Sequence, residues 1–368
     1  MSMRDRELDG LRGFAAIGVV IFHARYGAAF AWMWTLVDLF FVLSGFVITR
    51  IILDGLSTGG FSFRNFMIRR VLRIWPVYYS VLLLCLSYLF LKFLVSGAWP
   101  DVTGLKSAPL FLQFTHHYLA AGLNAGEENF IPWFHHSWSI AVEEQFYLLM
   151  PLLLVLFRRQ LNYAVYLIAA LVPLAVFFRY QEAYPWLLVS RMDALALGAL
   201  LAFYWRYLQG GDMPRLRIRP AYVALLGAVA LYMAMSLYFG LWIPVAWRYP
   251  LSLLGFNLLY ACVILCLLSQ WLPWLGRIFR SRVMLFLGAI SYALYMIHLP
   301  VRGVILSLTD GDLISNEPLY IQIGYFGLSI LAAWLSKVIL EDRVNRLKHK
   351  FPVKLSSETA AGQEAVAR

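Results

Sequence analysis

The sequence predicts an all-α, polytopic membrane protein with about ten transmembrane helices and both termini in the cytoplasm. Of its 368 residues, 61% are apolar and only 14% are charged, whereas soluble domains carry about 25% charged and about 45–50% apolar residues. The apolar residues also gather into runs of roughly 20, the length that crosses a bilayer as a helix. The polar residues are too few to cover a globule of this size, which excludes a soluble enzyme, a disordered chain and a nucleic-acid-binding protein.

Ten stretches satisfy this length criterion when the chain is read from its N-terminus. The first keeps ionisable residues inside it and continues without a small-residue cleavage site, so we expect a retained helix rather than a cleaved signal peptide. The predicted spans are residues 10–28, 35–53, 76–95, 139–157, 162–179, 186–206, 220–240, 250–270, 283–303 and 318–340.

The charges predict the topology. The chain carries 31 Lys and Arg against 20 Asp and Glu, a formal net charge of +11. In a membrane protein such an excess marks the cytoplasmic side, because basic loops stay inside. With the N-terminus inside, twenty basic residues fall in cytoplasmic segments, which supports an even number of spans. The five basic residues that fall on the outside are Arg25, Lys106, Arg179, Arg248 and Arg302.

Segments between the spans complete the predicted organisation. Residues 61–75 are short and mix apolar with basic side chains, which predicts a helix lying at the cytoplasmic interface of the lipid bilayer. Residues 96–138 form the longest external loop. Residues 1–350 are expected to make one integral membrane domain, and residues 351–368 a polar, mobile cytoplasmic tail.

Four of the seven histidines lie in the external loop, but they do not predict a metal site. His116, His117, His135 and His136 come as adjacent pairs, without a cysteine or a spaced carboxylate to complete a ligand set. His136 is of interest for a different reason, because it directly precedes the polar start of the fourth span.

Ionisable residues inside spans are costly and are therefore functional candidates. Arg12 and His23 lie eleven residues apart in the first span. Eleven helical steps return to within about 20° of the starting direction and rise about 16 Å, so the two side chains share one face. A structural alternative is an arginine that reaches the interface and a histidine held by a core hydrogen bond; for His23 on this stripe we favour a functional role.

A second candidate site is the basic cluster of Arg69, Arg70 and Arg73, which crowd one side of a helix. Like charges at this spacing repel one another by a few tenths of a kcal/mol. Such a cluster either attracts anionic lipid headgroups or binds a polyphosphate through arginine forks. The sequence leaves both interpretations open.

Other spans also carry polar candidates. Ser139, Glu143 and Tyr147 follow at four-residue spacing in the fourth span and share a face. Arg191 and Asp193 in the sixth span cannot pair on one helix face, so each needs a partner from elsewhere. The remaining candidates are Asp38 in the second span, Trp138 before the fourth, and Ser291, Tyr292, Tyr295 and His298 in the ninth.

These motifs together resemble the acyltransferase 3 family of membrane acyltransferases, in order and over residues 7–345. The pattern begins with Leu-Asp-Gly-Leu-Arg-Gly, followed by a histidine that is separated from the arginine by ten intervening residues. It continues with Asp-Leu-Phe-Phe-Val-Leu-Ser-Gly-Phe, a basic Arg-x-x-Arg with Ile-x-Pro, and Trp-Ser-Ile-Ala-Val-Glu-Glu-Gln-Phe-Tyr. In this sequence the motifs are residues 8–13, His23, residues 38–46, Arg70 and Arg73 with Ile74 and Pro76, and residues 138–147. A last motif late in the chain consists of Ser291, Tyr292, Tyr295 and His298.

The resemblance implies a ten-helix core that transfers acyl groups, usually acetyl, from cytoplasmic acyl-CoA to sugars at or beyond the outer face. It implies His23 as the catalytic residue and Arg12, Arg70 and Arg73 as donor-binding residues. Acyl-CoA would be the donor substrate, with no tightly bound cofactor and no metal. A glycan or glycolipid would be the acceptor, and the bacterial cytoplasmic (inner) membrane the location.

The residues and the resemblance fit one scheme. The CoA phosphates bind the cluster that includes Arg69, and His23 takes the proton of a sugar hydroxyl as it attacks the thioester. An imidazole with its ordinary pKa of about 6.5 suits this role. Asp38 or Glu143 would orient the imidazole or bind acceptor hydroxyls. The predicted substrate-binding residues are Trp138, Ser139, Tyr147, Arg191, Asp193, Ser291, Tyr292, Tyr295 and His298.

The alternative is a transporter or flippase for a glycan or an anionic substrate, in which the buried polar residues form a translocation path. It accounts for the polar residues but not for three arginines beside a span, and we find no inverted repeat. The sequence leaves open the acceptor hydroxyl, the acyl group, direct transfer against an acyl-enzyme step, and the oligomeric state.

Overall fold

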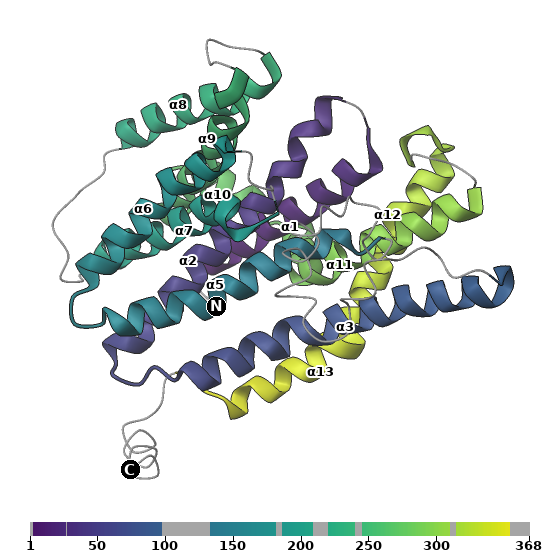
Figure 1. Cartoon of the computed structure of the whole chain (residues 1–368), viewed down its shortest axis with the longest axis horizontal. Helices are drawn as coiled ribbons and strands as arrows, with labels where there is room; N and C mark the ends of the chain where they lie inside the picture. The colour runs from purple at the N-terminus through teal and green to yellow at the C-terminus, as the bar shows by residue number, and fades with distance from the viewer. Residues whose placement is uncertain are drawn as a thin grey trace. The chain divides into compact units, whose positions relative to one another are not determined.

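The computed structural model describes residues 3–26, 28–97, 133–181, 186–208, 220–239, 245–309 and 314–353. Within these ranges every regular element is a helix (Figure 1). The predicted all-α class is therefore confirmed. Most of the predicted external loop, with His116 and His117, and most of the predicted tail lie outside the described residues.

The helices follow one another in a simple order. The long ones are α1 (Met3–Ala24), α2 (Leu36–Ser57), α3 (Phe63–Ser96), α5 (Trp138–Leu156), α6 (Leu161–Tyr180), α7 (Leu188–Leu208), α8 (Pro220–Phe239), α9 (Val245–Leu268), α11 (Arg282–Thr309) and α12 (Leu319–Ser336). Short helical turns are η1 (Ala28–Thr35), η4 (His135–Ser137), α10 (Pro273–Phe279), η5 (Ile314–Asn316), η6 (Lys337–Glu341), α13 (Asp342–Asn345) and η7 (Arg346–Lys350).

Eight segments of the described chain are long and apolar enough to cross a membrane. They coincide with eight of the ten predicted spans. The other two predicted spans are helices that fall short of this criterion. Helix α1 carries charged residues through its first half, from Arg4 to Arg12, and the apolar part of α8 covers residues 220–235.

Helix α3 differs from its prediction, because the expected interfacial helix and the following span form one continuous helix. Its 34 residues extend about 51 Å, whereas the hydrocarbon core of a bilayer is about 30 Å thick. The basic N-terminal part can therefore lie outside the hydrocarbon while the rest crosses it. Pro76 lies inside the helix and has no N–H to donate; Ser80 donates its hydroxyl to the Pro76 carbonyl at 2.7 Å.

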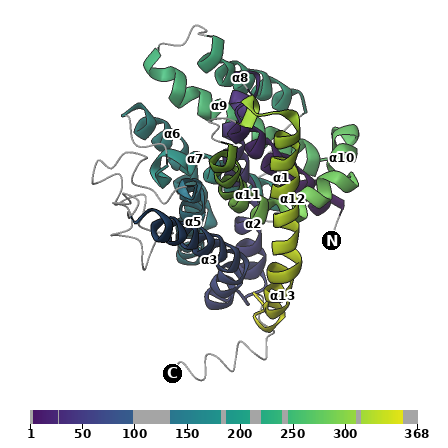
Figure 2. The same ribbon diagram turned by 90° about the vertical axis from the view of Figure 1, so that its right-hand side faces the viewer.

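The contacts divide the chain into two compact units. The first comprises residues 1–37, 74–142 and 272–345. In it α1 packs along α11, α11 packs along α12, and α10 contacts α1 (Figure 2).

Glycines bring the backbones of α1, α10 and α11 into contact. A Cβ atom at Gly10 would lie 1.8 Å from the carbonyl oxygen of Phe279, and one at Gly288 would lie 2.0 Å from that of Asp9. Small residues at such contacts are what allows membrane helices to approach closely. The buried carboxylate of Glu7 also accepts a hydrogen bond from Arg280 at 2.8 Å. The position of α1 against α11 is thus closely fixed.

The second unit comprises residues 38–73, 143–271 and 346–368. Within it α6 packs on α7, α8 on α9, and α9 also contacts α6 and α7. Gly45 of α2 and Gly198 of α7 again sit where a Cβ would meet a facing backbone carbonyl, at 2.1 Å and 2.0 Å. Helices α2 and α7 therefore meet without intervening side chains at this point.

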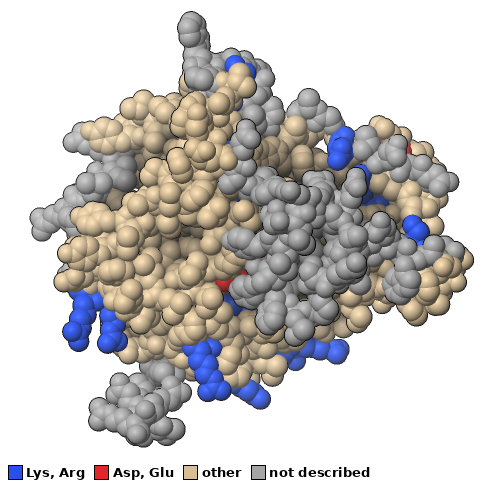
Figure 3. All heavy atoms as spheres, in the orientation of Figure 1, with Lys and Arg blue, Asp and Glu red and all other residues tan. Residues whose placement is uncertain are grey.

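Large apolar side chains on several helices point outward rather than into the units. Leu83, Leu84 and Leu91 of α3 and Leu149 and Leu152 of α5 are each at least half exposed. The face shown in Figure 3 is correspondingly made mostly of residues that are neither basic nor acidic, with Lys and Arg at its margins. Apolar surface of this extent suits contact with lipid, and the chain is a multi-pass membrane protein.

Candidate functional site

The centre of the first unit's polar residues is a pair of histidines from two helices. His23 lies in the last turn of α1 and His298 in the middle of α11. Nδ1 of His23 is 3.1 Å from Nε2 of His298, and the ring centroids are 4.9 Å apart. His23 is partly exposed, whereas His298 is fully buried. The pair therefore combines an accessible imidazole with a shielded one.

Both imidazoles are also held by their own helices. Nδ1 of His23 lies 2.9 Å from the carbonyl oxygen of Val19, one turn earlier in α1. Nδ1 of His298 lies 3.1 Å from the carbonyl oxygen of Leu294, one turn earlier in α11. The His298 ring is therefore held through both of its nitrogens, whereas both contacts of His23 are made at its Nδ1.

A second group of polar side chains surrounds His298. The ring of His136 lies 5.3 Å from that of His298 and 5.2 Å from that of Tyr295, between centroids. The Tyr295 hydroxyl donates to the His136 carbonyl at 2.9 Å and is 2.8 Å from the Ser139 hydroxyl. The structure thus gathers four residues singled out in the sequence, His136, Ser139, Tyr295 and His298.

The other candidates of α11 have structural partners. The Ser291 hydroxyl donates to the carbonyl of Gly288 in its own helix at 2.9 Å. The Tyr292 hydroxyl donates to the carbonyl of Ile74 in α3 at 2.8 Å. Trp138, at the start of α5, is partly buried.

Arg12 of α1 is held in an ion pair with Asp9, at 2.9 Å. Its side chain is 20% exposed and that of Asp9 31%. The two residues are one turn apart, so the pair is local to the helix. Arg12 is thus partly exposed, and the face that it shares with His23 follows from their eleven-residue spacing in one helix.

The second unit contains a cluster around Glu143. The Ser44 hydroxyl donates to Oε1 of Glu143 and the Tyr147 hydroxyl to Oε2, both at 2.6 Å. The guanidinium of Arg70 stacks over the Tyr147 ring at 5.9 Å and over the Phe66 ring at 5.6 Å. Both carboxylate oxygens of Glu143 therefore accept hydrogen bonds from hydroxyls of the chain itself. These bonds fix the Tyr147 ring, on which the guanidinium of Arg70 stacks.

The three arginines of the basic cluster have different surroundings. Arg69 donates to the backbone carbonyls of Lys348 at 3.1 Å and Phe351 at 3.3 Å. Arg70 is half-buried between the two aromatic rings, and Arg73 is exposed. Arg69 therefore ties α3 to the segment after α13, which leaves Arg70 and Arg73 as the better candidates for an anion.

Residues 348–353 lie against the N-terminal part of α3 through further bonds. The amide of Asn65 donates to the Pro352 carbonyl at 2.9 Å, and the backbone N–H of Ser62 donates to the Val353 carbonyl at 3.1 Å. The described start of the predicted mobile tail is thus bonded to α3.

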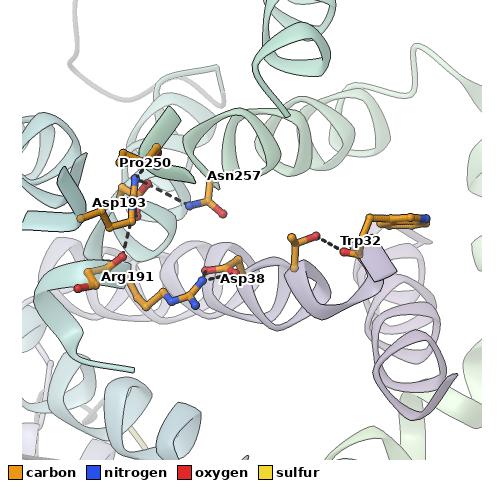
Figure 4. A network of polar contacts seen from close by, with 9 residues as sticks. Trp32, Asp38, Arg191, Asp193, Pro250 and Asn257 are labelled. Carbon is orange, nitrogen blue, oxygen red and sulfur yellow. Dashed lines mark hydrogen bonds and ion pairs between the residues drawn. The ribbon is translucent and has the colours of Figure 1, made fainter. Parts of the chain in front are cut away.

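Two buried ion pairs hold Arg191 and Asp193, the charged residues in the first turns of α7 (Figure 4). Arg191 donates to Asp38 of α2 at 2.8 Å. Asp193 accepts two bonds from Arg179 of α6, both at 2.8 Å, and one from Asn257 of α9 at 3.0 Å. The expectation that each needs a partner outside its own helix agrees with these contacts. The carboxylate of Asp38, proposed from sequence to orient the imidazole or to bind acceptor hydroxyls, is bonded to Arg191.

Three partners were not recognised from the sequence. Arg179 was predicted to lie on the outer side, at the end of the span 162–179, although an unmatched Asp193 in a span requires a cation. Ser44 lies inside the Asp38–Phe46 motif without a stated role. The pairing of His23 with His298 joins residues 275 positions apart, so no local spacing reports it.

Among the described residues no group of three or more His, Cys, Asp or Glu side chains has the arrangement of a metal site. The imidazoles of His23 and His298 face each other through ring nitrogens, and that of His136 lies against His298 by its ring. Because the imidazole of His23 is partly exposed, it can accept or donate a proton.

These features define a class: a helical, multi-pass membrane protein with a paired imidazole on two packed helices and a basic, aromatic-stacked site on another element. Residues 5–338 match the family described as "Acyltransferase domain", the acyltransferase 3 family. The chain belongs to this family.

Several staphylococcal proteins are similar to the chain over most of its length. A protein of Staphylococcus aureus (strain COL) named "Putative O-acetyltransferase SACOL0978" is 28% identical over 355 residues, with 91% of this chain and 56% of that protein covered. The "O-acetyltransferase OatA" of Staphylococcus aureus (strain NCTC 8325 / PS 47) is 25% identical over 356 residues, with 92% and 57% covered. The chain therefore spans a little over half the length of these relatives. No solved structure gives a significant match.

Proposed function

We propose that the protein transfers an acyl group, acetyl in the first instance, from acyl-CoA to a hydroxyl of a carbohydrate, with His23 as the general base. The observation that carries this proposal is the imidazole pair, which leaves His23 partly exposed and holds its ring on the Nδ1 side. Family membership and relatives named as O-acetyltransferases support acyl transfer to oxygen. They favour it over the transporter interpretation.

The chemistry requires one base and a polar, water-poor site. His23 takes the proton from the acceptor hydroxyl while its oxygen attacks the thioester carbonyl. The new C–O bond forms, the C–S bond breaks, and the imidazolium returns the proton to the departing thiolate. Ester and free thiol are the products, so the step is balanced without a further reactant.

The donor headgroup is assigned to Arg70 and Arg73. A planar guanidinium stacked on two rings is held in orientation, and such a fork suits the phosphates of CoA. Arg12, which lies on the same α1 face as His23, is proposed to help guide the donor along that face. We place the protein in a bacterial cytoplasmic membrane, with a cell-envelope glycan as the acceptor.

The proposed function is tested with membranes from cells that express the chain, incubated with acetyl-CoA carrying ¹⁴C in the acetyl group and with isolated cell-envelope polysaccharide of the host. We expect label in the polysaccharide that mild alkali releases, as it does from an O-acetyl ester. Membranes lacking the chain are the control. Equal labelling in both preparations would contradict acyl transfer, and movement of unlabelled glycan would support a transporter instead.

Replacing Arg70 by alanine is expected to raise the KM for acetyl-CoA about tenfold or more, since a hydrogen bond to a charged group contributes about 1.5–3 kcal/mol. Acetyl-dephospho-CoA should already bind the unaltered protein less well. Arg159→Ala, which removes an equal but exposed charge at the end of α5, is the matched control. If Arg70→Ala and Arg159→Ala have the same KM, the cluster serves lipid contact rather than the donor.

A further inference from the structure

We infer that His298 is a positioning residue, which fixes the tautomer of His23 so that Nε2 of His23 carries the lone pair that receives the acceptor proton. The inference rests on the proposed function for the role of His23. It gives His298 a role different from the substrate binding that is predicted from the sequence.

The first step concerns His298 itself. Its Nδ1 lies 3.1 Å from the Leu294 carbonyl oxygen, and a carbonyl can only accept. Nδ1 of His298 therefore carries the hydrogen. A neutral imidazole has one N–H, so Nε2 of His298 is an acceptor.

The second step concerns His23. Its Nδ1 faces two groups, the carbonyl oxygen of Val19 at 2.9 Å and Nε2 of His298 at 3.1 Å. Both are acceptors, so Nδ1 of His23 must be the donor and its hydrogen is shared between them. The lone pair is left on Nε2. Which nitrogen of a histidine is protonated is set by the bond that the other nitrogen makes, and here two independent acceptors require the same tautomer.

The third step is the response to proton transfer. When His23 accepts a proton at Nε2, its Nδ1–H remains a donor to His298, and the bond becomes charge-assisted and stronger. His298 thus favours the charged intermediate without moving. It is fully buried, and the ring of His136 lies on its other side.

The tight α1–α11 contact is what makes this arrangement effective. Gly13 of α1 and Gly288 of α11 sit where a Cβ would lie 2.5 Å and 2.0 Å from backbone oxygens of the facing segments. Helices in such contact hold their side chains at fixed distances. The 3.1 Å separation of the two imidazoles is then a property of the helix pair rather than of two mobile side chains.

The experiment is ¹⁵N NMR of the full chain with labelled histidine in lipid nanodiscs, with His23→Gln used to assign the His23 signals. In the unaltered protein we expect the Nδ1 signal of His23 to be that of a protonated nitrogen and Nε2 that of an unprotonated one. The opposite pattern would overturn the inference without any variant. Because the spectrum needs no substrate, this outcome is separate from the failure of the proposed function.

Two variants complete the test. His298→Leu removes the acceptor and is expected to lower kcat about 10- to 100-fold, with the KM for acetyl-CoA unchanged, and to shift His23 toward the other tautomer. His298→Gln, which keeps an acceptor oxygen, is expected to retain most of the activity and the ¹⁵N pattern. His349→Leu, at an exposed histidine of η7, is the control. A His298→Leu protein with unchanged kcat and unchanged ¹⁵N signals would show that His298 does not position His23.

Discussion

Replacing His23 by alanine is expected to lower the rate of acetyl transfer by at least about 10²-fold, the usual contribution of a positioned general base. The loss should appear in kcat, because the Arg70 and Arg73 side chains proposed to bind the donor are unchanged. The measurement is the transfer of ¹⁴C-acetyl to polysaccharide at saturating acetyl-CoA.

The control for this variant is His349→Ala, which removes an exposed imidazole from η7. The variant must also be recovered from the membrane in the same amount and with the same thermal unfolding temperature as the unaltered protein. A His23→Ala protein that transfers acetyl at the original rate would remove His23 from the mechanism.

Replacing Asp193 by alanine is expected to lower the free energy of unfolding by about 3–5 kcal/mol, because it leaves the charge of Arg179 buried without its partner. Both side chains of the pair are fully buried, and the two bonds between them are 2.8 Å long. The amide of Asn257 loses its acceptor as well. The measurement is denaturant-induced unfolding in detergent.

The matched control is Asp342→Ala, which breaks the partly exposed pair with Lys337 at 2.6 Å. Exposed pairs contribute about 0–1 kcal/mol. The double variant Arg179→Met with Asp193→Leu should recover much of the lost stability, since it leaves no unpaired buried charge. If Asp193→Ala is no less stable than Asp342→Ala, the Arg179 pair does not support the second unit.

Much of the fold follows from hydropathy, because a run of apolar residues of bilayer length has few structures available to it. Eight predicted spans are helices that meet the membrane criterion in the described chain. The predicted boundary between residues 75 and 76 was wrong, because the mixture of basic and apolar residues over 61–75 favoured a separate interfacial helix, whereas α3 continues from Phe63 to Ser96.

The site was less accessible to sequence reasoning. The shared face of Arg12 and His23 follows from helical periodicity alone. Arg69, Arg70 and Arg73 look alike in sequence, yet Arg69 bonds the carbonyls after α13 and Arg70 stacks on Tyr147. These differences depend on segments distant in the chain, which no local pattern reports. The pairing of His23 with His298 could not be predicted for the same reason, because the two residues are far apart in the chain.

The contact between α1 and α11 also restricts how a substrate can reach His23. At Gly13 of α1 and Gly288 of α11 the backbone of the facing helix leaves no space even for one methyl group. A pantetheine arm is wider than a methyl group and cannot pass between these helices. The donor proposed above must therefore approach the His23 imidazole from outside this closed contact between α1 and α11.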